Sequence, residues 1–267
     1  MADYACGIAA DEEVVTLPDG RCALKATSWV QDAEAQQVIE GKHVTGHIRV
    51  SAKNVVIRKT RVDGTVTNWD SPNSSFRIED STVGKPVTSQ SQCIPGVSIG
   101  GHDFTSLRVH TQGVDDAYRA TKPGHVLIQD SYALLCGQAG SHSDGIQACC
   151  DSTGPGSYDD VAMVHNTIDQ RQSVDYTAPI NFYDAGLSNV RVVDNLFAGG
   201  TYTMFVRWTY GPKWVISDNS VVDKSWAYDP MSAEGTCSNI TAGNNRTVAI
   251  DANYNITGTV RTFGCID

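Results

Sequence analysis

Six short runs of the sequence follow one pattern, and this repeat constrains the fold more than any other feature. Each run has an apolar anchor, then Thr, Ser or Asn three positions later, and an apolar residue or alanine five positions later. Alternation within the runs predicts strands, and the fixed polar position predicts a turn. The gap of 50 residues after the second anchor has room for one more run, through 104–109. The anchors are Ile57, Ile78, Ile128, Met163, Val192 and Ile216.

A second set of runs lies between these, so each predicted coil holds about three short strands. A single coil cannot bury its apolar side chains, but stacked coils close a common core. A β-sandwich is the competing fold, but sandwich strands give no fixed residue position in every coil. We therefore predict an all-β solenoid of parallel strands. The second set comprises Gly96–Ile99, Asp116–Arg119, Asp144–Gln147, Pro179–Phe182 and Met204–Arg207.

We expect one domain in three parts. Residues 1–43 form an N-terminal loop and cap, residues 44–232 the coils, and residues 233–267 a C-terminal coil with a disulfide-stapled end. The segment Asp32–Glu40 is the one candidate for a short helix, and a cap there would cover exposed strand edges.

None of the eight cysteines stands in a C-x-x-C pair, which argues against a zinc site. Eight cysteines are many for a cytosolic protein of this size, so we expect disulfides in an exported protein. We expect Cys6 to pair with Cys22 and Cys237 with Cys265, whereas the connectivity of Cys93, Cys136, Cys149 and Cys150 stays open. A net charge of −10 argues against a nucleic-acid-binding surface. No apolar run is long enough for a membrane span. We expect a secreted monomer.

The repeated V-x-I-x-D-S/N-x-V units, with the central segment His142–Gln147, resemble the pectate-lyase-like, right-handed parallel β-helix proteins of secreted bacterial origin. The resemblance covers residues 44–230. It implies a single-stranded right-handed parallel β-helix with a short N-terminal cap and a polysaccharide as substrate. That fold carries lyases, hydrolases, epimerases and phage spikes, so the resemblance leaves the chemistry open.

The candidate site follows from two segments with the same pattern, Asp116-Ala-Tyr-Arg119 and Asp144-Gly-Ile-Gln147, which lie 28 positions apart. We expect them side by side on adjacent coils, with their polar groups on one surface. The predicted catalytic residues are Asp116, Arg119, Lys122, His142 and Asp144. The predicted substrate-binding residues are His110, Gln147, Asn181, Tyr183, Arg207 and Trp208.

Two chemistries fit these residue types. In β-elimination on a uronic acid polymer, arginine, lysine or a calcium ion held by Asp116 and Asp144 neutralises the substrate carboxylate. In hydrolysis, the two aspartates act as an acid and a base. A non-catalytic carbohydrate-binding or adhesive protein is the third alternative. Each aspartate could instead cap a turn of the backbone.

The complete catalytic motifs of the known β-helix enzymes are not found in this sequence. The segment Ser143-Asp144-Gly145 resembles the Asn-Thr-Asp-Gly motif of polygalacturonase-type hydrolases, whose aspartate is catalytic. That family has a further Asp-Asp one coil later, but Asp159-Asp160 follows after only 15 residues, and no Gly-His-Gly comes after it. The arginine motif of pectate lyases and their tryptophan-aspartate-histidine motif are missing too.

Overall fold

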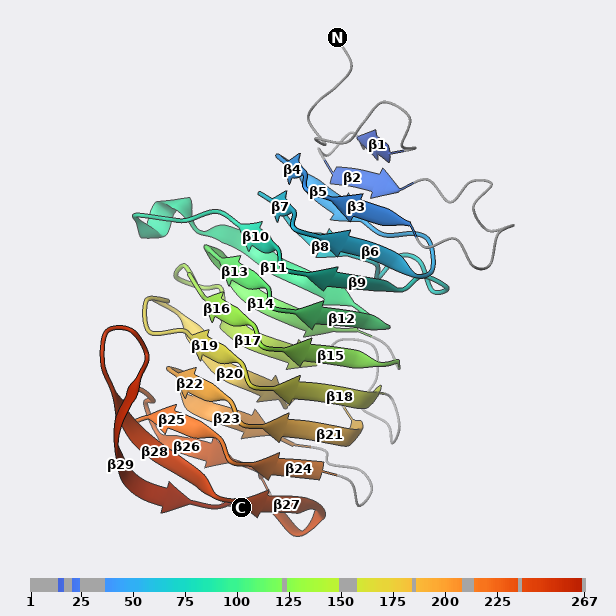
Figure 1. Ribbon diagram of the computed structural model, residues 1–267. Coiled ribbons are helices and arrows are strands. Elements are labelled where there is room, and N and C mark those ends of the chain that lie inside the picture. The colour runs from blue at the N-terminus through green and yellow to red at the C-terminus, as the bar shows by residue number, and fades with distance from the viewer. Residues whose placement is uncertain are drawn as a thin grey trace.

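Successive strands of the chain join three sheets in turn, so that each repeat of the sequence contributes one strand to each sheet (Figure 1). The computed structural model describes residues 14–16, 21–24, 37–121, 124–148, 158–183, 186–207, 214–234 and 237–265. These ranges contain no α-helix, only the short 3₁₀ helices η3 (Gln90–Gln92) and η4 (Cys237–Asn239). The prediction of an all-β chain of stacked parallel strands is confirmed.

Sheets A and B form two walls of the stack. Sheet A contains β1 (Val14–Thr16), β2 (Arg21–Leu24), β5 (His47–Arg49), β8 (Val66–Thr67), β11 (Ile94–Gly101), β14 (Val114–Ala120), β17 (Ser143–Ala148), β20 (Tyr176–Phe182), β23 (Tyr202–Val206) and β26 (Asp229–Ser232). Sheet B contains β3 (Val38–Glu40), β6 (Val55–Arg58), β9 (Phe76–Glu79), β12 (Phe104–Leu107), β15 (Val126–Gln129), β18 (Tyr158–Val164), β21 (Leu187–Val193), β24 (Trp214–Ser217) and β27 (Ile240–Gly243).

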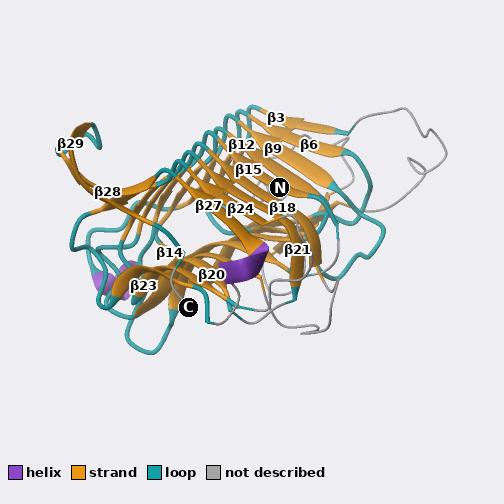
Figure 2. Cartoon of the chain, turned by 90° about the horizontal axis from the view of Figure 1, so that it is seen from below, coloured by secondary structure: helices purple, strands orange, loops and turns teal. Residues whose placement is uncertain are grey.

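Sheet C forms the third wall and ends in a hairpin. It contains β4 (His43–Val44), β7 (Arg61–Val62), β10 (Thr82–Gly84), β13 (His110–Gln112), β16 (Tyr132–Leu134), β19 (Thr167–Asp169), β22 (Leu196–Ala198), β25 (Ser220–Val222), β28 (Asn245–Ile250) and β29 (Ile256–Phe263). All neighbours are parallel except the β1–β2 and β28–β29 pairs. Seen from below, β29 curves away from the walls (Figure 2).

The apolar anchors form one row across sheet B, as their spacing predicts. Ile57 pairs with Ile78, and Ile128 pairs with Met163 in the same register. The strand predicted in the long gap is β12, where Ser106 takes the anchor position. Its hydroxyl lies 3.3 Å from the buried hydroxyl of Tyr118, so a polar pair replaces the missing apolar side chain there.

The turn between sheets B and C explains the fixed polar position. One residue with positive φ bends the chain, and the next residue is the Thr, Ser or Asn of the repeat. In the last repeats these are asparagines whose side chains bond from turn to turn: the Asn195 Oδ1 accepts the Asn166 backbone N–H at 2.9 Å, and the Asn219 Oδ1 accepts that of Asn195 at 3.1 Å. This ladder satisfies buried backbone donors that the turn would otherwise leave unpaired.

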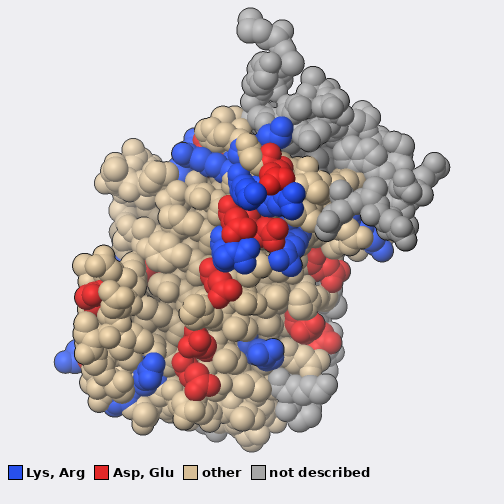
Figure 3. Space-filling model, viewed as in Figure 1, with Lys and Arg blue, Asp and Glu red and all other residues tan. Residues whose placement is uncertain are grey.

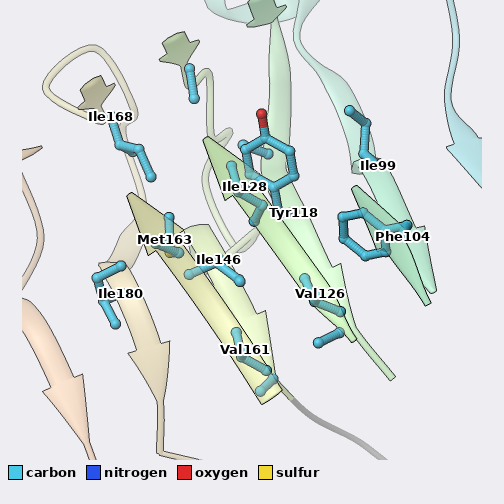
Figure 4. Packing of buried hydrophobic residues seen from close by; sticks show 14 of the residues in the cluster. Ile99, Phe104, Tyr118, Val126, Ile128, Ile146, Val161, Met163, Ile168 and Ile180 are labelled. Atoms are coloured by element: carbon cyan, nitrogen blue, oxygen red, sulfur yellow. The ribbon is translucent and has the colours of Figure 1, made fainter. Parts of the chain in front are cut away.

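The core lies between the walls (Figure 4). Ile99, Tyr118, Ile146 and Ile180 come from consecutive strands of sheet A and meet apolar side chains of sheet B. Ile99, Ile146 and Ile180 are fully buried and Tyr118 nearly so. Truncating such a side chain typically costs about 2–5 kcal/mol, so this stacking is a main source of stability.

The N-terminal end differs from the prediction. Residues Val38–Glu40 form strand β3, not the end of a helix, because Val38 and Ile39 pair with Val56 and Ile57 of β6. The repeats therefore begin before residue 44, since β3, β4 and β2 already belong to the three sheets. The rest of the predicted helix, 32–36, lies outside the described residues.

Two disulfides fasten the described chain. Cys237–Cys265 closes the C-terminal end, as predicted. Cys93–Cys136 joins the segment before β11 to the segment after β16, a pairing that the sequence left open. The predicted Cys6–Cys22 pair and the side chains of Cys149 and Cys150 lie outside the described residues. The described part of the chain has no helix with the length and apolar character needed to cross a membrane.

Candidate active site on sheet A

The register of sheet A places the two predicted segments side by side. Arg119 pairs with Gln147, Gln147 with Asn181, and Asn181 with Phe205. We call these four residues the sheet A row. The row confirms the predicted alignment of Asp116–Arg119 with Asp144–Gln147 on adjacent strands. It runs across the strands, and neighbouring strands are spaced about 4.8 Å apart.

Asp116 lies three residues before Arg119 in β14 and is buried, with 4% of its surface exposed. Its Oδ2 accepts a hydrogen bond from the Arg119 Nη2 at 2.5 Å, and its Oδ1 accepts the backbone N–H of Asp144 at 2.9 Å. The prediction that the polar groups share one surface therefore does not hold for this buried carboxyl group. Asp116 contacts the half-buried Arg119, but the carboxyl group itself is turned toward the backbone of the next strand.

Asp144 repeats this arrangement one strand later, with 2% of its surface exposed. Its Oδ1 accepts the backbone N–H of Ala178 at 3.2 Å, and its Oδ2 accepts the Asn181 Nδ2 at 3.0 Å. The carboxylates thus link β14 to β17 and β17 to β20. The structure is consistent with the alternative in which the aspartates cap the backbone, because each carboxylate accepts a backbone N–H of the following repeat.

Irregular register in sheet A accompanies the inward turn of these side chains. The β11–β14 pairing shifts between Ile94 and Val97, just before the pair Val97–Asp116. The β17–β20 pairing shifts between Ser143 and Asp144, and a bulge re-aims the side chains next to it. The Ser143 hydroxyl donates to the Asp115 backbone carbonyl, and the Gln170 side-chain amide donates to the Ser143 carbonyl. These buried bonds fix the shifted strand entrance.

Burial changes the acidity of both carboxyl groups. Burial raises the pKa of Asp116 to about 6, although Arg119 and the Asp144 N–H act in the opposite direction. Burial and the neighbouring Asp116 charge raise the pKa of Asp144 well above its usual value. Arg119 bonds Asp116 and not Asp144, and the charge on Asp116 disfavours a second charge on Asp144, so the pair favours one ionised and one protonated carboxyl group on adjacent strands.

The donor set does not fit the calcium ion expected from the sequence. All four carboxylate oxygens of Asp116 and Asp144 already accept hydrogen bonds from N–H donors. Calcium takes six to eight oxygen ligands, and the described residues contain no group of three or more His, Cys, Asp or Glu side chains arranged to hold a metal ion. We derive no step through calcium.

Aromatic rings continue the row beyond Asn181. The Tyr183 and Phe205 rings stack with centroids 4.3 Å apart, and Tyr202 stacks on Phe205 at 5.2 Å. Tyr228, which is 69% exposed, follows at 5.4 Å from Tyr202. The Arg207 guanidinium lies 4.7 Å from the centroid of Tyr183. The structure thus brings Tyr183 and Arg207 together at one end of the row.

Other predicted residues lie elsewhere. His142 stands in the turn before β17 with positive φ, and its side chain is 78% exposed beside Asp175 rather than against the aspartates. His110 belongs to β13 of sheet C, where its ring packs on Tyr132 at 5.0 Å. His110 therefore does not lie beside the sheet A row, the place predicted for a substrate-binding residue, because a turn at Gly113 separates β13 from β14. Lys122 and Trp208 lie outside the described residues.

Sequence reasoning missed Phe205. Strand alternation puts its neighbour Val206 inward and therefore puts Phe205 outward, so the signal was present. Phenylalanine is commonly buried, and this expectation hid the alternation. No signal in the sequence indicated the bond between the Ser143 hydroxyl and Asp115, because it depends on the shifted register.

The comparisons with known proteins add no relative from which a function could be inferred: no protein-family model matches the chain, and no curated protein or solved structure matches it significantly.

Proposed function

We propose that the chain is a secreted, right-handed parallel β-helix that binds an acidic polysaccharide along the sheet A row and cleaves it by β-elimination. The observation that carries the proposal is the contact between Arg119 and Asp116, beside a second carboxyl group of raised pKa. The disulfides Cys93–Cys136 and Cys237–Cys265 support an extracellular location, since such bonds persist in oxidising compartments.

Arg119 is the proposed neutraliser of the substrate carboxylate. Its side chain is 30% exposed, and Nη2 is the donor that it gives to Asp116. A guanidinium has five N–H donors, so donors remain for a uronate at the surface. Pairing the uronate with a cation stabilises the negative charge that develops when the proton on the adjacent carbon is removed.

Asp116 and Asp144 are the proposed base and acid. With a pKa of about 6, Asp116 is mostly ionised at neutral pH and still basic enough to take the proton. The electron pair of the broken C–H bond forms the new carbon–carbon double bond, and the bond to the glycosidic oxygen breaks. Asp144, which favours its protonated form, supplies a proton to the leaving oxygen.

The aromatic end of the row is the proposed binding platform. Tyr202 and Phe205 belong to β23, and Tyr228 directly precedes the neighbouring strand β26, so the three rings form a stacked line beside these two strands of sheet A. Aromatic rings offer flat apolar surfaces against which sugar rings stack. A polymer extended along this line would pass from the platform over Asn181 and Gln147 to Arg119.

Hydrolysis is the second candidate, and the raised pKa of Asp144 favours it. A protonated and an ionised carboxyl group on adjacent strands are the two groups that a glycosidase needs. In this chemistry Asp144 protonates the glycosidic oxygen and Asp116 acts as the base or nucleophile. Arg119 would then serve only to position Asp116.

A panel of polygalacturonate, alginate and neutral polysaccharides separates these alternatives. Elimination produces an ultraviolet-absorbing unsaturated sugar together with each reducing end, whereas hydrolysis produces reducing ends alone. Arg119→Ala and Asp116→Asn should each lower kcat by at least ~100-fold. The exposed arginine of sheet B, in Arg191→Ala, is the control and should leave activity unchanged.

Two results would count against the proposal. Binding of a polysaccharide without any new chain ends would make the protein a binding module. Full activity of both Arg119→Ala and Asp116→Asn would move any catalytic site away from the sheet A row.

A further inference from the structure

A pocket of about 410 Å³ lies away from the sheet A row, between the outer side of sheet C and the C-terminal hairpin. Thr167, Leu196 and Ser220 form its floor and stand at the same register position in consecutive strands of sheet C. Tyr254 and Ile256 of the hairpin also line it. Its volume lies within the range of small-molecule binding sites, and the sheet A mechanism does not use it.

The hairpin is held in place over this floor. The Tyr254 hydroxyl donates to the Asp169 Oδ2 at 2.7 Å, and the Tyr132 hydroxyl lies 2.9 Å from the Tyr254 hydroxyl. Asp169 also pairs with Arg171 at 2.7 Å. Burial acts to raise the pKa of Asp169, but the hydrogen bonds from Arg171 and Tyr254 hold it below its usual value. The carboxylate therefore stays charged and anchors the hairpin tip.

The turn of the hairpin is equally well built. The Asp251 carboxylate accepts the backbone N–H groups of Asn253 and Asn255 at 2.8 and 3.0 Å, and the Asn255 side-chain amide at 2.9 Å. A turn closed by three such bonds keeps Tyr254 directed at sheet C. The pocket is thus preorganised, which lowers the entropy lost when a ligand binds.

The lining combines an aromatic ring, apolar side chains and charges of both signs. Tyr132 is the aromatic residue of the lining. Its neighbour in the preceding strand is His110, whose ring packs on it, and its neighbour in the following strand is Thr167 of the pocket floor. Leu196 and Ile256 add apolar surface. Asp194 and Arg246 add an exposed acceptor and an exposed donor.

These features favour one ligand class. The acidic side chains of Asp130 and Asp194 disfavour an anion, and Arg246 disfavours a cation. The face seen in Figure 3 also carries Lys and Arg beside Asp and Glu, but these pairs, such as Arg58–Glu40 and Arg108–Asp80, belong to the repeats before the pocket. A neutral ligand rich in hydroxyl groups satisfies the donors and acceptors, while its apolar ring face rests on Tyr132.

We propose that this pocket binds one or two neutral sugar units of a polysaccharide, independently of the cleavage proposed for sheet A. The protein would then hold a neutral glycan on sheet C while the sheet A row contacts an acidic one. Such a site attaches the protein to a mixed polysaccharide without contributing to the reaction.

The test is calorimetric titration of the full chain with cellotriose, xylotriose and mannotriose, with trigalacturonate as the acidic comparison. Thr167→Trp fills the floor and should weaken binding of the neutral trisaccharide at least tenfold. Thr82→Trp is the matched control, because Thr82 is equally half-buried and occupies the same register position in β10, outside the pocket. It should bind as the unmodified protein does.

Arg246→Ala, at an exposed position, provides a second variant that should fold normally and also bind more weakly. Arg119→Ala should retain neutral binding, which distinguishes this pocket from the sheet A row. The proposal is overturned if no neutral trisaccharide binds at millimolar concentration, if only trigalacturonate binds, or if Thr167→Trp or Arg246→Ala binds as tightly as Thr82→Trp.

Discussion

Asp116 makes the stability of this protein fall as pH rises, relative to a variant that lacks its charge. Burial raises its pKa from the usual 3.8 to about 6, so the folded protein holds this proton more tightly than the unfolded chain. The stabilisation is complete below about pH 3.8 and is lost as pH rises through about 6. At 1.36 kcal/mol per pH unit, this difference amounts to about 3 kcal/mol.

The perturbation is Asp116→Asn, which keeps an oxygen acceptor for the Asp144 N–H but removes the charge. Urea unfolding of both proteins between about pH 3 and pH 8 gives the difference in unfolding free energy at each pH. The unmodified protein should lose about 3 kcal/mol relative to the variant over this range. Comparing the two proteins cancels the titration of the carboxylates away from this pair. The Asp116 charge raises the pKa of Asp144, so the comparison is repeated with Asp144→Asn in both proteins to remove that contribution.

Asp169→Asn is the control of opposite sign. Asp169 is as buried as Asp116, but its hydrogen bonds with Arg171 and Tyr254 lower its pKa. The unmodified protein should therefore gain stability relative to this variant as pH rises from acid. A pH-independent difference for Asp116→Asn, or one of the same sign as for Asp169→Asn, would refute the reasoning.

Three further predictions concern other parts of the molecule. Asn195→Ala should lower the unfolding free energy by about 3 kcal/mol, because it leaves the buried Asn166 N–H without its acceptor; urea unfolding measures this. Replacing Cys93 and Cys136 by alanine should cost about 4 kcal/mol, from the 43-residue separation that the disulfide spans, and lower the melting temperature. Phe205→Ala should raise KM for polysaccharide while changing kcat little, since the ring belongs to the platform and not to the carboxyl pair.

The sequence predicts the stacked strands because the repeat acts at two levels. The apolar anchors such as Ile128 set the inward face, and the polar residues such as Ser131 and Asn166 set the turn. Both signals are local and recur in each repeat, so one ambiguous run does not change the predicted fold. The segment around Val38 does not follow the repeat pattern, so the sequence did not indicate a strand there. The helix prediction for this segment was wrong because pairing with β6 outweighs the local conformational preference.

The candidate site was predicted in its alignment but not in its burial. Spacing places Asp116 and Asp144 on adjacent strands, and the register confirms this. Spacing does not reveal the register shifts in β11–β14 and β17–β20, or the burial that raises the pKa of both carboxyl groups. His110 was misplaced for a related reason, since the position of one turn decides which sheet a short strand joins.

The tie between Tyr254 and the middle of sheet C has a consequence for how the molecule comes apart. In a stack where each repeat contacts mainly its neighbours, the ends fray first. Here the hydroxyl of Tyr254 bonds residues that stand 85 and 122 positions earlier in the chain. Opening the last repeats requires that these bonds break, so β19, β22, β25 and β28 should exchange their amide hydrogens as one cooperative unit, while the strands at the opposite end open in sequence.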